Sequence, residues 1–275
     1  MIDLCTVSYN TRPLLERQLN TLLSDSPAEY DRPWHLFIAD NDSQDDTRDF
    51  LRTHTTGPTA VLYNKNIGYA RACNQLAALG EGDIIGLLNA DVWLTTSDVM
   101  AIQKSFDEDP NMHLMGPKQR DERGNITHAG IVGTNTAPRH RGWHLPDQED
   151  IQFRDKVPVV TVSGSAYFIR RSTWEALTND EEYVALVKDF VTRGLLQADA
   201  LEYPGAFIHT PHYYEETFCS YFANHRGYGL YYDGRVSIGH SWHASHSKGS
   251  EVDQSWSISQ NIFREACDKL GIEHD

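Results

Sequence analysis

Long hydrophobic runs are absent from this sequence. Its longest apolar stretch covers residues 157–169 and is interrupted by Pro158, Ser163 and Gly164, whereas a membrane-spanning helix needs about 18 consecutive apolar residues. The first ten residues, MIDLCTVSYN, have neither a basic segment nor a cleavage site, and they predict a β-strand. We therefore expect a soluble, cytoplasmic protein, with peripheral contact with a membrane left open.

Cysteine is scarce, and negative charge outnumbers positive charge. Without Cys-x-x-Cys spacing, buried free thiols in a reducing compartment are expected for the four cysteines, Cys5, Cys73, Cys219 and Cys267. The 24 Lys and Arg residues against 39 Asp and Glu residues give a formal net charge of -15. Nucleic-acid binding needs a basic face that displaces phosphate counterions, so this balance opposes general nucleic-acid binding. Arg139, His140 and Arg141 form one compact basic cluster.

The first 115 residues instead show a regular alternation of short apolar runs with segments of helical period. Strands are expected at IDLCTVS, WHLFIAD, TAVLYN and DIIGLLNA, and helices at RPLLERQLNTLL, DTRDFLRTH, GYARACNQLAAL and SDVMAIQKSF. This alternation predicts an α/β fold with a mostly parallel central sheet flanked by helices on both faces. Ligands of such sheets bind at the carboxyl ends of the strands.

After about residue 115 the pattern is less regular. We expect hairpins at GLYYDGRVSIGH, around Asp233-Gly234, and at Gly124-Asn125. The segment VVTVSGSAYFIRR predicts a strand, and residues 134–157 predict a polar, mobile loop that holds the basic cluster. Further helices are expected over residues 180–196, 214–226 and about 254–270. With neither repeats nor linkers in the sequence, we expect a single domain over 1–275, with a nucleotide-sugar half at 1–115 and an acceptor and catalytic half at 116–275.

Four polar groupings carry the candidate chemistry, and three of them follow predicted strands. They are Ser8-Tyr9-Asn10, Asp40-Asn41, Asn89-Ala90-Asp91, and Glu215-Glu216 with the later His240 and His243. A single polar residue at a strand end is more often a turn or a cap than a ligand. The order of the four groupings along the chain is what favours a site at one edge of the sheet.

Each grouping also has a simpler explanation. Asp91 could cap a helix that begins near Thr96, although Ser97 is the better candidate for that cap. Glu215 and Glu216 open a predicted helix, where acidic residues are favoured by the helix dipole alone. The segment RHRGWH could be a solvated loop, and we expect His243 and His246 at the surface. Four rings could stack on a sugar or belong to the core: Tyr213, Tyr214, Trp143 and Trp242.

Six motifs in a fixed order give the sequence a family resemblance. They are VSYN, IADNDSQDDT, NKNIGYARACN, LLNADVWL, VSGSAYFIRRSTWEAL and YYEETFCSYFANHRGYGLYYDGRVSIGH, and they cover most of residues 2–240. With them the sequence resembles an inverting glycosyltransferase of the GT-A fold, family 2, in the rhamnosyltransferase-like branch. The resemblance implies a GT-A (Rossmann-like) sheet followed by an acceptor-side portion of helices and hairpins, and transfer of a hexosyl or deoxyhexosyl group.

The resemblance implies donor-binding and metal-binding roles. Asp40 would accept from the nucleobase imide or the ribose, with Ser8 and Asn10 in the same pocket and Arg71 near the diphosphate. Asn89-Ala90-Asp91 stands where the family has Asp-x-Asp, so Asn89 departs from the pattern and Asp91 is the metal-binding carboxylate. His240 matches the histidine that completes the metal site. The donor would be a UDP-, dTDP- or GDP-sugar.

The resemblance also implies the residues around the transferred sugar. Ser163 and Gly164 would face that sugar, and Arg141 would contact the diphosphate or the acceptor. Glu215-Glu216 occupies the family's Glu-Asp catalytic pair, in which the second residue, Glu216, is the base. Glu in place of Asp is a departure, because the extra methylene moves the carboxylate by about an ångström, a displacement that can reduce a rate about 10²-fold.

Elementary chemistry agrees with these roles. Departure of a diphosphate requires neutralisation of its charge, and a mixed set of oxygen and nitrogen ligands suits Mn²⁺, with Mg²⁺ as the alternative. One base without a covalent nucleophile favours inversion. A nucleotide-sugar-binding module without turnover is the alternative, and a nucleotidyltransferase ranks lower because VSYNTRPLL lacks phosphate-loop glycines. The acceptor hydroxyl stays open among glycans, lipid-linked sugars, proteins and modified nucleobases.

Overall fold

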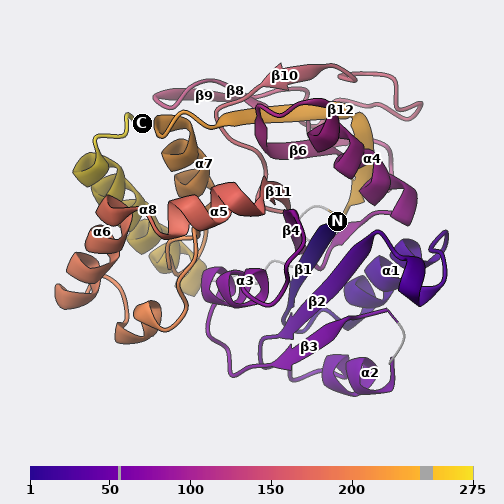
Figure 1. Ribbon diagram of the computed structural model, residues 1–275, viewed down its shortest axis with the longest axis horizontal. Helices are drawn as coiled ribbons and strands as arrows, with labels where there is room; N and C mark the ends of the chain where they lie inside the picture. Colours follow the sequence, from indigo (N-terminus) through magenta and orange to yellow (C-terminus); the bar gives the residue numbers. More distant parts are fainter. Residues whose placement is uncertain (55–56, 242–249, 275) are drawn as a thin grey trace.

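The computed structural model describes residues 1–54, 57–241 and 250–274 (Figure 1). In this part of the chain a ten-stranded sheet has the order β10-β12-β6-β11-β4-β1-β2-β3, with β5 paired to β12 and β7 paired to β6. Its strands are β1 Ile2–Ser8, β2 Trp34–Asp40, β3 Ala60–Tyr63, β4 Ile84–Asn89, β5 Val92–Trp93, β6 Met112–Arg120, β7 Ile126–His128, β10 Lys156–Pro158, β11 Ala166–Arg170 and β12 Gly229–His240. β8 Ile131–Thr134 and β9 Ala137–His140 form a separate hairpin.

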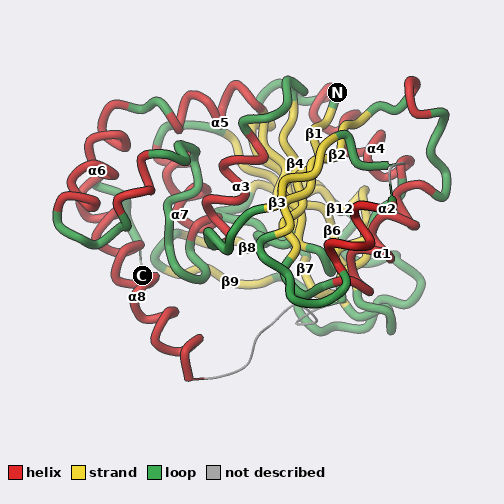
Figure 2. Tube along the Cα trace, turned by 90° about the horizontal axis from the view of Figure 1, so that it is seen from below, coloured by secondary structure: helices red, strands yellow, loops and turns green. Residues whose placement is uncertain are grey.

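Helices cover both faces of this sheet. They are α1 Arg12–Leu23, α2 Thr47–Thr53, α3 Tyr69–Ala77, α4 Thr96–Glu108, α5 Arg171–Thr178, α6 Glu181–Thr192, α7 Glu215–His225 and α8 Ser250–Leu270, with 3-10 turns η1 Glu29–Asp31 and η2 Ala198–Leu201. One apolar core packs α1, α2 and α4 against the sheet, and a second packs α3, α5, α6, α7 and α8 against the opposite face. Figure 2 shows the strands between these two groups of helices.

The predicted, mostly parallel central sheet is confirmed. β3, β2, β1 and β4 are parallel neighbours, as the alternation of the first half predicts. β11 runs antiparallel between β4 and β6, and β12 is parallel to β6. The carboxyl ends of β1, β2, β3, β4, β6 and β12 therefore meet at one edge, called the carboxyl edge below.

Two predictions for the second half are wrong. Residues 134–157 are a loop only over residues 141–155, because backbone pairing places β9 and the start of β10 at the two ends of this segment. The segment GLYYDGRVSIGH is one strand, β12, with a register shift between Asp233 and Ser237. Asp233 accepts from the backbone N–H and the guanidinium of Arg235, so the Asp-Gly pair forms a bulge instead of a turn.

Three smaller predictions have clear outcomes. The Gly124-Asn125 hairpin is confirmed between β6 and β7. In the segment VVTVSGSAYFIRR only β11 is a strand. The residues before β11 make separate backbone hydrogen bonds, from Val159 N–H to Leu230 O and from Val160 N–H to Ile131 O. Helix α4 is capped by Thr95, whose side chain accepts from Asp98 N–H, so neither Asp91 nor Ser97 is its cap.

The composition-based expectations can also be compared with the structure. All four cysteines lie within the described residues and are buried thiols. Over residues 1–54, 57–241 and 250–274, no helix combines the length and apolar character needed to cross a bilayer.

Candidate active site

The carboxyl edge brings three of the four predicted polar groupings together. In the sheet register Ser8 lies opposite Asp40 on one side, and its neighbour Val7 lies opposite Asn89 on the other. The N–H of Asn89 donates to Ser165 O at 2.9 Å, which joins the end of β4 to the Ser163–Ser165 segment before β11. The strands thus align these side chains in the order β2, β1, β4, β11.

Asp40 closes the β2 side of this edge. Its buried carboxylate accepts from Arg48 Nε through Oδ2 at 2.5 Å, while its Oδ1 atom has no hydrogen-bond partner among the described residues. Next to it, Asn10 adopts a left-handed backbone (φ 53°), and its Oδ1 accepts from the N–H of Gln44 at 2.7 Å. The Ser8 hydroxyl lies 2.7 Å from that of Thr11. This part of the edge therefore offers one buried carboxylate oxygen to a ligand donor.

Asp91 and His240 meet at the other side of β4. β5 follows Asp91 directly and pairs with the end of β12, with His240 opposite Val92. As a result, His240 Nε2 lies 3.7 Å from Asp91 Oδ1, and both side chains are buried. The turn itself is held by Gln18, whose Nε2 donates to the carbonyl oxygens of Asn89 and Val92 at 2.9 Å each.

This pair fits a divalent cation as two ligands of a larger set. Metal bonds to a carboxylate oxygen or an imidazole nitrogen are about 2.0–2.2 Å long, so two donors 3.7 Å apart can share one ion. Within the described residues, no three His, Cys, Asp or Glu side chains form a group that could hold a metal ion. His243, grouped with His240 by the sequence, lies outside the described residues.

Gly164 and Glu216 are in direct contact at the β11 side. A Cβ atom on Gly164 would lie 2.9 Å from Glu216 Cγ and 3.0 Å from Glu216 Cδ. The Tyr69 hydroxyl, at the start of α3, donates to Gly164 O at 3.4 Å, and the Ser163 and Ser165 hydroxyls lie 2.7 Å apart. Glycine is needed here because any side chain would displace the Glu216 carboxylate.

The two acidic residues at the start of α7 have different surroundings. Glu215 is buried and accepts from the Thr210 hydroxyl at 3.0 Å. Burial, together with the charge of Glu216, raises the pKa of Glu215 from 4.5 to about 8. Burial also raises the pKa of Glu216, which is less enclosed than Glu215. At neutral pH the raised pKa of Glu215 therefore favours a proton on Glu215.

Two predicted arginines have other partners in the structure. Arg71 of α3 pairs with Asp199 at 3.0 Å and bonds to Gln197 Oε1 at 2.9 Å. Arg141 makes a two-pronged ion pair with Asp155, at 2.8 and 3.0 Å. Both guanidinium groups thus form intramolecular ion pairs, and their predicted contacts with a diphosphate or an acceptor remain predictions.

Sequence reasoning missed several residues that build this site. Gln18 interrupts the apolar face of α1, between Leu15 and Leu22, and a buried polar residue in such a face was a usable signal. Arg48 follows the predicted strand end by eight residues, and its cationic side chain next to Asp40 could have been suspected. Thr210 and Tyr69 gave no signal, because each reaches its partner only through the fold.

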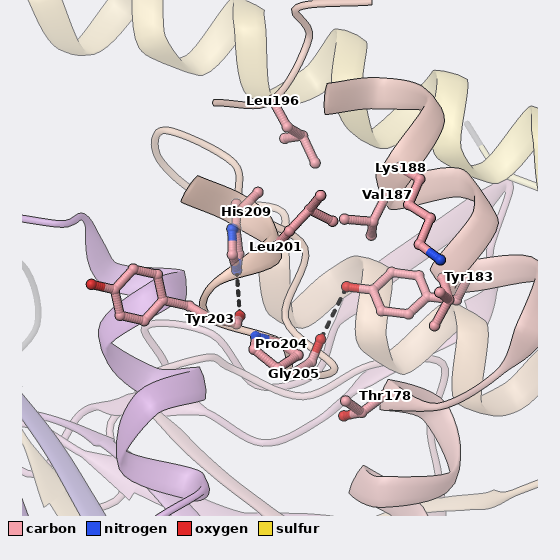
Figure 3. Close-up of a pocket in the computed structure, with 12 residues that line it drawn as sticks. Thr178, Tyr183, Val187, Lys188, Leu196, Leu201, Tyr203, Pro204, Gly205 and His209 are labelled. Atoms are coloured by element: carbon pink, nitrogen blue, oxygen red, sulfur yellow. Dashed lines mark hydrogen bonds between the residues drawn. The ribbon is translucent and has the colours of Figure 1, made fainter. Parts of the chain in front are cut away.

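An apolar pocket lies next to residues 203–209, in the segment that leads to Glu215. Its volume is about 250 Å³, and α6, η2 and residues 203–209 line it (Figure 3). Tyr183 donates its hydroxyl to Gly205 O at 3.1 Å, and His209 Nε2 lies 3.0 Å from Tyr203 O, as the dashed lines in Figure 3 show. These bonds hold the segment before Thr210 and so help to position Glu215.

The fold and its polar edge define an α/β protein of the GT-A class. Comparison with known families agrees: the family described as "Glycosyl transferase family 2" matches residues 3–177. That match covers more than half of the sequence, and the chain belongs to glycosyl transferase family 2.

Individual relatives are more distant. The chain is 26% identical, over 213 residues, to an N-acetylglucosaminyl-diphospho-decaprenol L-rhamnosyltransferase of Mycobacterium tuberculosis, with 69% of this chain and 68% of the relative covered. Among solved structures, S. aureus TarS 1-349 in complex with UDP-GlcNAc superposes with a TM-score of 0.58 at 12% identity, over 100% of this chain and 68% of that one. GalNAc-T7 with UDP, GalNAc and Mn²⁺ superposes with a TM-score of 0.61 at 13% identity, over 98% and 47%. At these identities the two structures show the fold alone.

Proposed function

We propose that this family 2 glycosyltransferase moves a sugar from a UDP-, dTDP- or GDP-sugar to a hydroxyl acceptor, with inversion and with dependence on a divalent cation. The observation that carries the proposal is the arrangement of the carboxyl edge. Asp91 and His240 stand 3.7 Å apart, the nearby Asn89 N–H donates to Ser165 O, and Glu216 contacts Gly164 of that same Ser163–Ser165 segment. A donor placed along the edge would have its diphosphate at the first pair and its sugar at Gly164.

The nucleotide would bind at the β1–β2 side of this edge. The Asp40 Oδ1 atom is buried without a hydrogen-bond partner, and an imide N–H or a ribose hydroxyl would supply the missing donor. Asp91 and His240 would hold the cation, Mn²⁺ or Mg²⁺, and the bound cation would neutralise the leaving diphosphate as a Lewis acid. With two protein ligands, further ligands would come from the diphosphate oxygens, which makes metal and nucleotide binding interdependent.

Glu216 would act as the base. Burial raises the pKa of Glu216, which makes it a stronger proton acceptor than an exposed glutamate, and a proton on Glu215 removes the negative charge next to it. The acceptor hydroxyl would give its proton to Glu216 as its oxygen bonds to the anomeric carbon. The bond between that carbon and the diphosphate oxygen breaks in the same step, and the electron pair leaves with the diphosphate. A single displacement of this kind inverts the anomeric carbon.

The transferred group is proposed from the relatives. The mycobacterial relative is named as a rhamnosyltransferase, which supports a deoxyhexosyl group, and the TarS complex contains UDP-GlcNAc, which supports a hexosyl group. We also propose that residues 1–115 bind the nucleotide and that residues 116–275, which include Glu216, bind the acceptor and carry out the transfer.

Donor hydrolysis and product stereochemistry test the proposal together. Nucleotide release from a panel of UDP-, dTDP- and GDP-sugars is measured with Mn²⁺, with Mg²⁺ and with EDTA, and the sugar released is followed by proton NMR before it mutarotates. We expect one donor class to be turned over only with metal and with inversion. Retention would refute the single displacement, metal-independent turnover would refute the role of Asp91 and His240, and tight donor binding without turnover would indicate a binding module.

A further inference from the structure

Three aromatic rings form an exposed stack at the base of the β8–β9 hairpin. The ring centroids of His140 and Trp143 are 5.0 Å apart with planes at 27°, and those of Trp143 and His144 are 4.6 Å apart with planes at 23°. Trp143 is 44% exposed, and exposed Leu145 and Ile151 lie in the same loop. Large apolar groups that a fold keeps in water at one place are typical of a binding surface.

The loop that carries this stack is held rigidly by buried charges. Lys118 of β6 is fully buried and pairs with Asp147 at 2.8 Å and with Asp150 at 2.5 Å. The Lys118 ammonium also donates to Gln152 O at 2.7 Å. Breaking a buried pair of this kind typically destabilises a protein by about 3–5 kcal/mol. The buried contacts of Lys118 therefore anchor the loop, while the rings of the loop are exposed.

The same loop contains strained backbone. His144, Asp150 and Phe153 have φ values of 63°, 56° and 50°, in the left-handed region that side chains other than glycine rarely adopt. Gly142 has φ 61°, and a Cβ there would lie 2.6 Å from the Phe153 ring. Strain of this kind persists where surrounding structure enforces it, and it concentrates at ligand-binding segments. The anchoring and the strain both serve to present the stack.

The hairpin that bears His140 is attached to the proposed catalytic segments at two points. At its tip the Tyr221 hydroxyl of α7 donates to Asn135 O at 3.2 Å, and Figures 1 and 2 both place β8 beside α7. At its base Ile131 pairs with His140 on one side and with Thr161 on the other, two residues before Ser163. With strands about 4.8 Å apart, His140 lies about 10 Å from the Thr161 strand.

Charge indicates the class of ligand. Three acidic residues of the loop pair with cations, Asp147 with Lys118, Asp150 with Lys118 and Arg120, and Asp155 with Arg141, while Glu149 is exposed. The chain as a whole carries -15, which opposes a polyanion. A sugar ring has an apolar C–H face bordered by hydroxyl groups. Flat rings provide the surface for that face, and the imidazole nitrogens provide hydrogen-bonding partners for the hydroxyls.

We propose that the His140–Trp143–His144 stack binds a sugar ring of the acceptor, so that the acceptor is a glycan. The inference rests on the proposed glycosyl transfer and adds the acceptor class to it. Trp143 is thus a binding residue for the acceptor, separate from the donor site at the carboxyl edge.

Glycan binding and acceptor kinetics test this assignment. The fluorescently labelled full chain is applied to a glycan microarray as wild type, Trp143→Ala, Trp143→Phe and Trp143→Leu, with Leu79→Ala as a control for loss of an exposed apolar side chain (Leu79 is 43% exposed). We expect the wild type, Trp143→Phe and Leu79→Ala to retain a class of glycans that Trp143→Ala and Trp143→Leu lose. With a retained glycan as acceptor, Trp143→Ala should raise the acceptor KM about tenfold, the size expected for one aromatic contact.

The controls separate the two proposals. Donor hydrolysis without acceptor should be the same in Trp143→Ala and wild type, because the stack does not touch the donor. A wild type that hydrolyses no donor refutes the proposed function, while Trp143-dependent glycan binding would still establish the stack as a sugar site. Three results would overturn the assignment: retention of no glycan by the wild type, equal retention by Trp143→Ala, or Trp143-dependent binding of single-stranded oligonucleotides in place of glycans.

Discussion

Replacement of Gly164 by alanine tests how the structure positions Glu216. The added Cβ would lie 2.9 Å from Glu216 Cγ and 3.0 Å from its Cδ, whereas carbon atoms in contact prefer about 3.5–4.0 Å. Glu216 must therefore move by about 0.5–1 Å. A displacement of about 1 Å at a reacting group can reduce a rate about 10²-fold, which corresponds to about 2.7 kcal/mol in the activation free energy.

The assay for Gly164→Ala is donor hydrolysis, with nucleotide affinity measured by calorimetry on the same preparation. We expect kcat to fall about 100-fold while the Kd for the nucleotide stays unchanged, because Asp40, Asp91 and His240 are not touched. A double-mutant cycle adds a second control: in a Glu216→Gln background, Gly164→Ala should lower the residual rate no further. Wild-type turnover in Gly164→Ala, or an equal loss in the Glu216→Gln background, would refute the reasoning.

Three further predictions concern charge. Glu215 keeps a proton in the folded protein up to about pH 8, whereas the unfolded chain releases it near pH 4.5, so the free energy of unfolding should fall between about pH 5 and pH 8. In urea titrations, Glu215→Gln should flatten this pH profile and raise the free energy of unfolding at pH 8 by a few kcal/mol, about 5 kcal/mol at most. Parallel pH profiles of the wild type and Glu215→Gln would contradict the assigned proton. Asp91→Ala should abolish the enhancement of nucleotide binding by Mn²⁺, with nucleotide affinity in EDTA as the control; an intact enhancement would remove Asp91 from the metal site. Lys118→Met should lower the free energy of unfolding by about 3–5 kcal/mol, because Asp147 is left buried without its cation; a change below 1 kcal/mol would show that the ion pair does not anchor the loop.

The parallel half of the fold could be predicted because its signals are local. β1, β2 and β4 are buried almost continuously, and their sequences are mostly apolar. The helices between them have apolar residues at helical spacing, which fixes their type before any contact is known. The placement of Asp40 and Asn89 at strand ends follows directly from the lengths of these strands.

The second half was harder because its structure depends on distant partners. β12 reads as a hairpin at Asp233-Gly234, and only its pairing with β6 and the bond from Arg235 to Asp233 turn the site into a bulge. The strands of the β8–β9 hairpin, Ile-Val-Gly-Thr and Ala-Pro-Arg-His, are four residues long and do not alternate apolar and polar residues, so no periodicity marks them. Arg71 and Arg141 were predicted from motif position alone, whereas their ion pairs depend on Asp199, 128 residues away, and on Asp155.

The different environments of Glu215 and Glu216, the two residues of the proposed catalytic pair, allow the most direct test of the proposed mechanism. Donor turnover and nucleotide Kd are measured for Glu216→Gln and Glu215→Gln beside the wild type. Glutamine mimics the protonated Glu215 but cannot accept a proton in place of Glu216, so Glu215→Gln should retain most of its activity. Glu216→Gln should lose about 10²- to 10⁴-fold with unchanged nucleotide affinity. Full turnover by Glu216→Gln, or loss confined to Glu215→Gln, would contradict the assignment of Glu216 as the base.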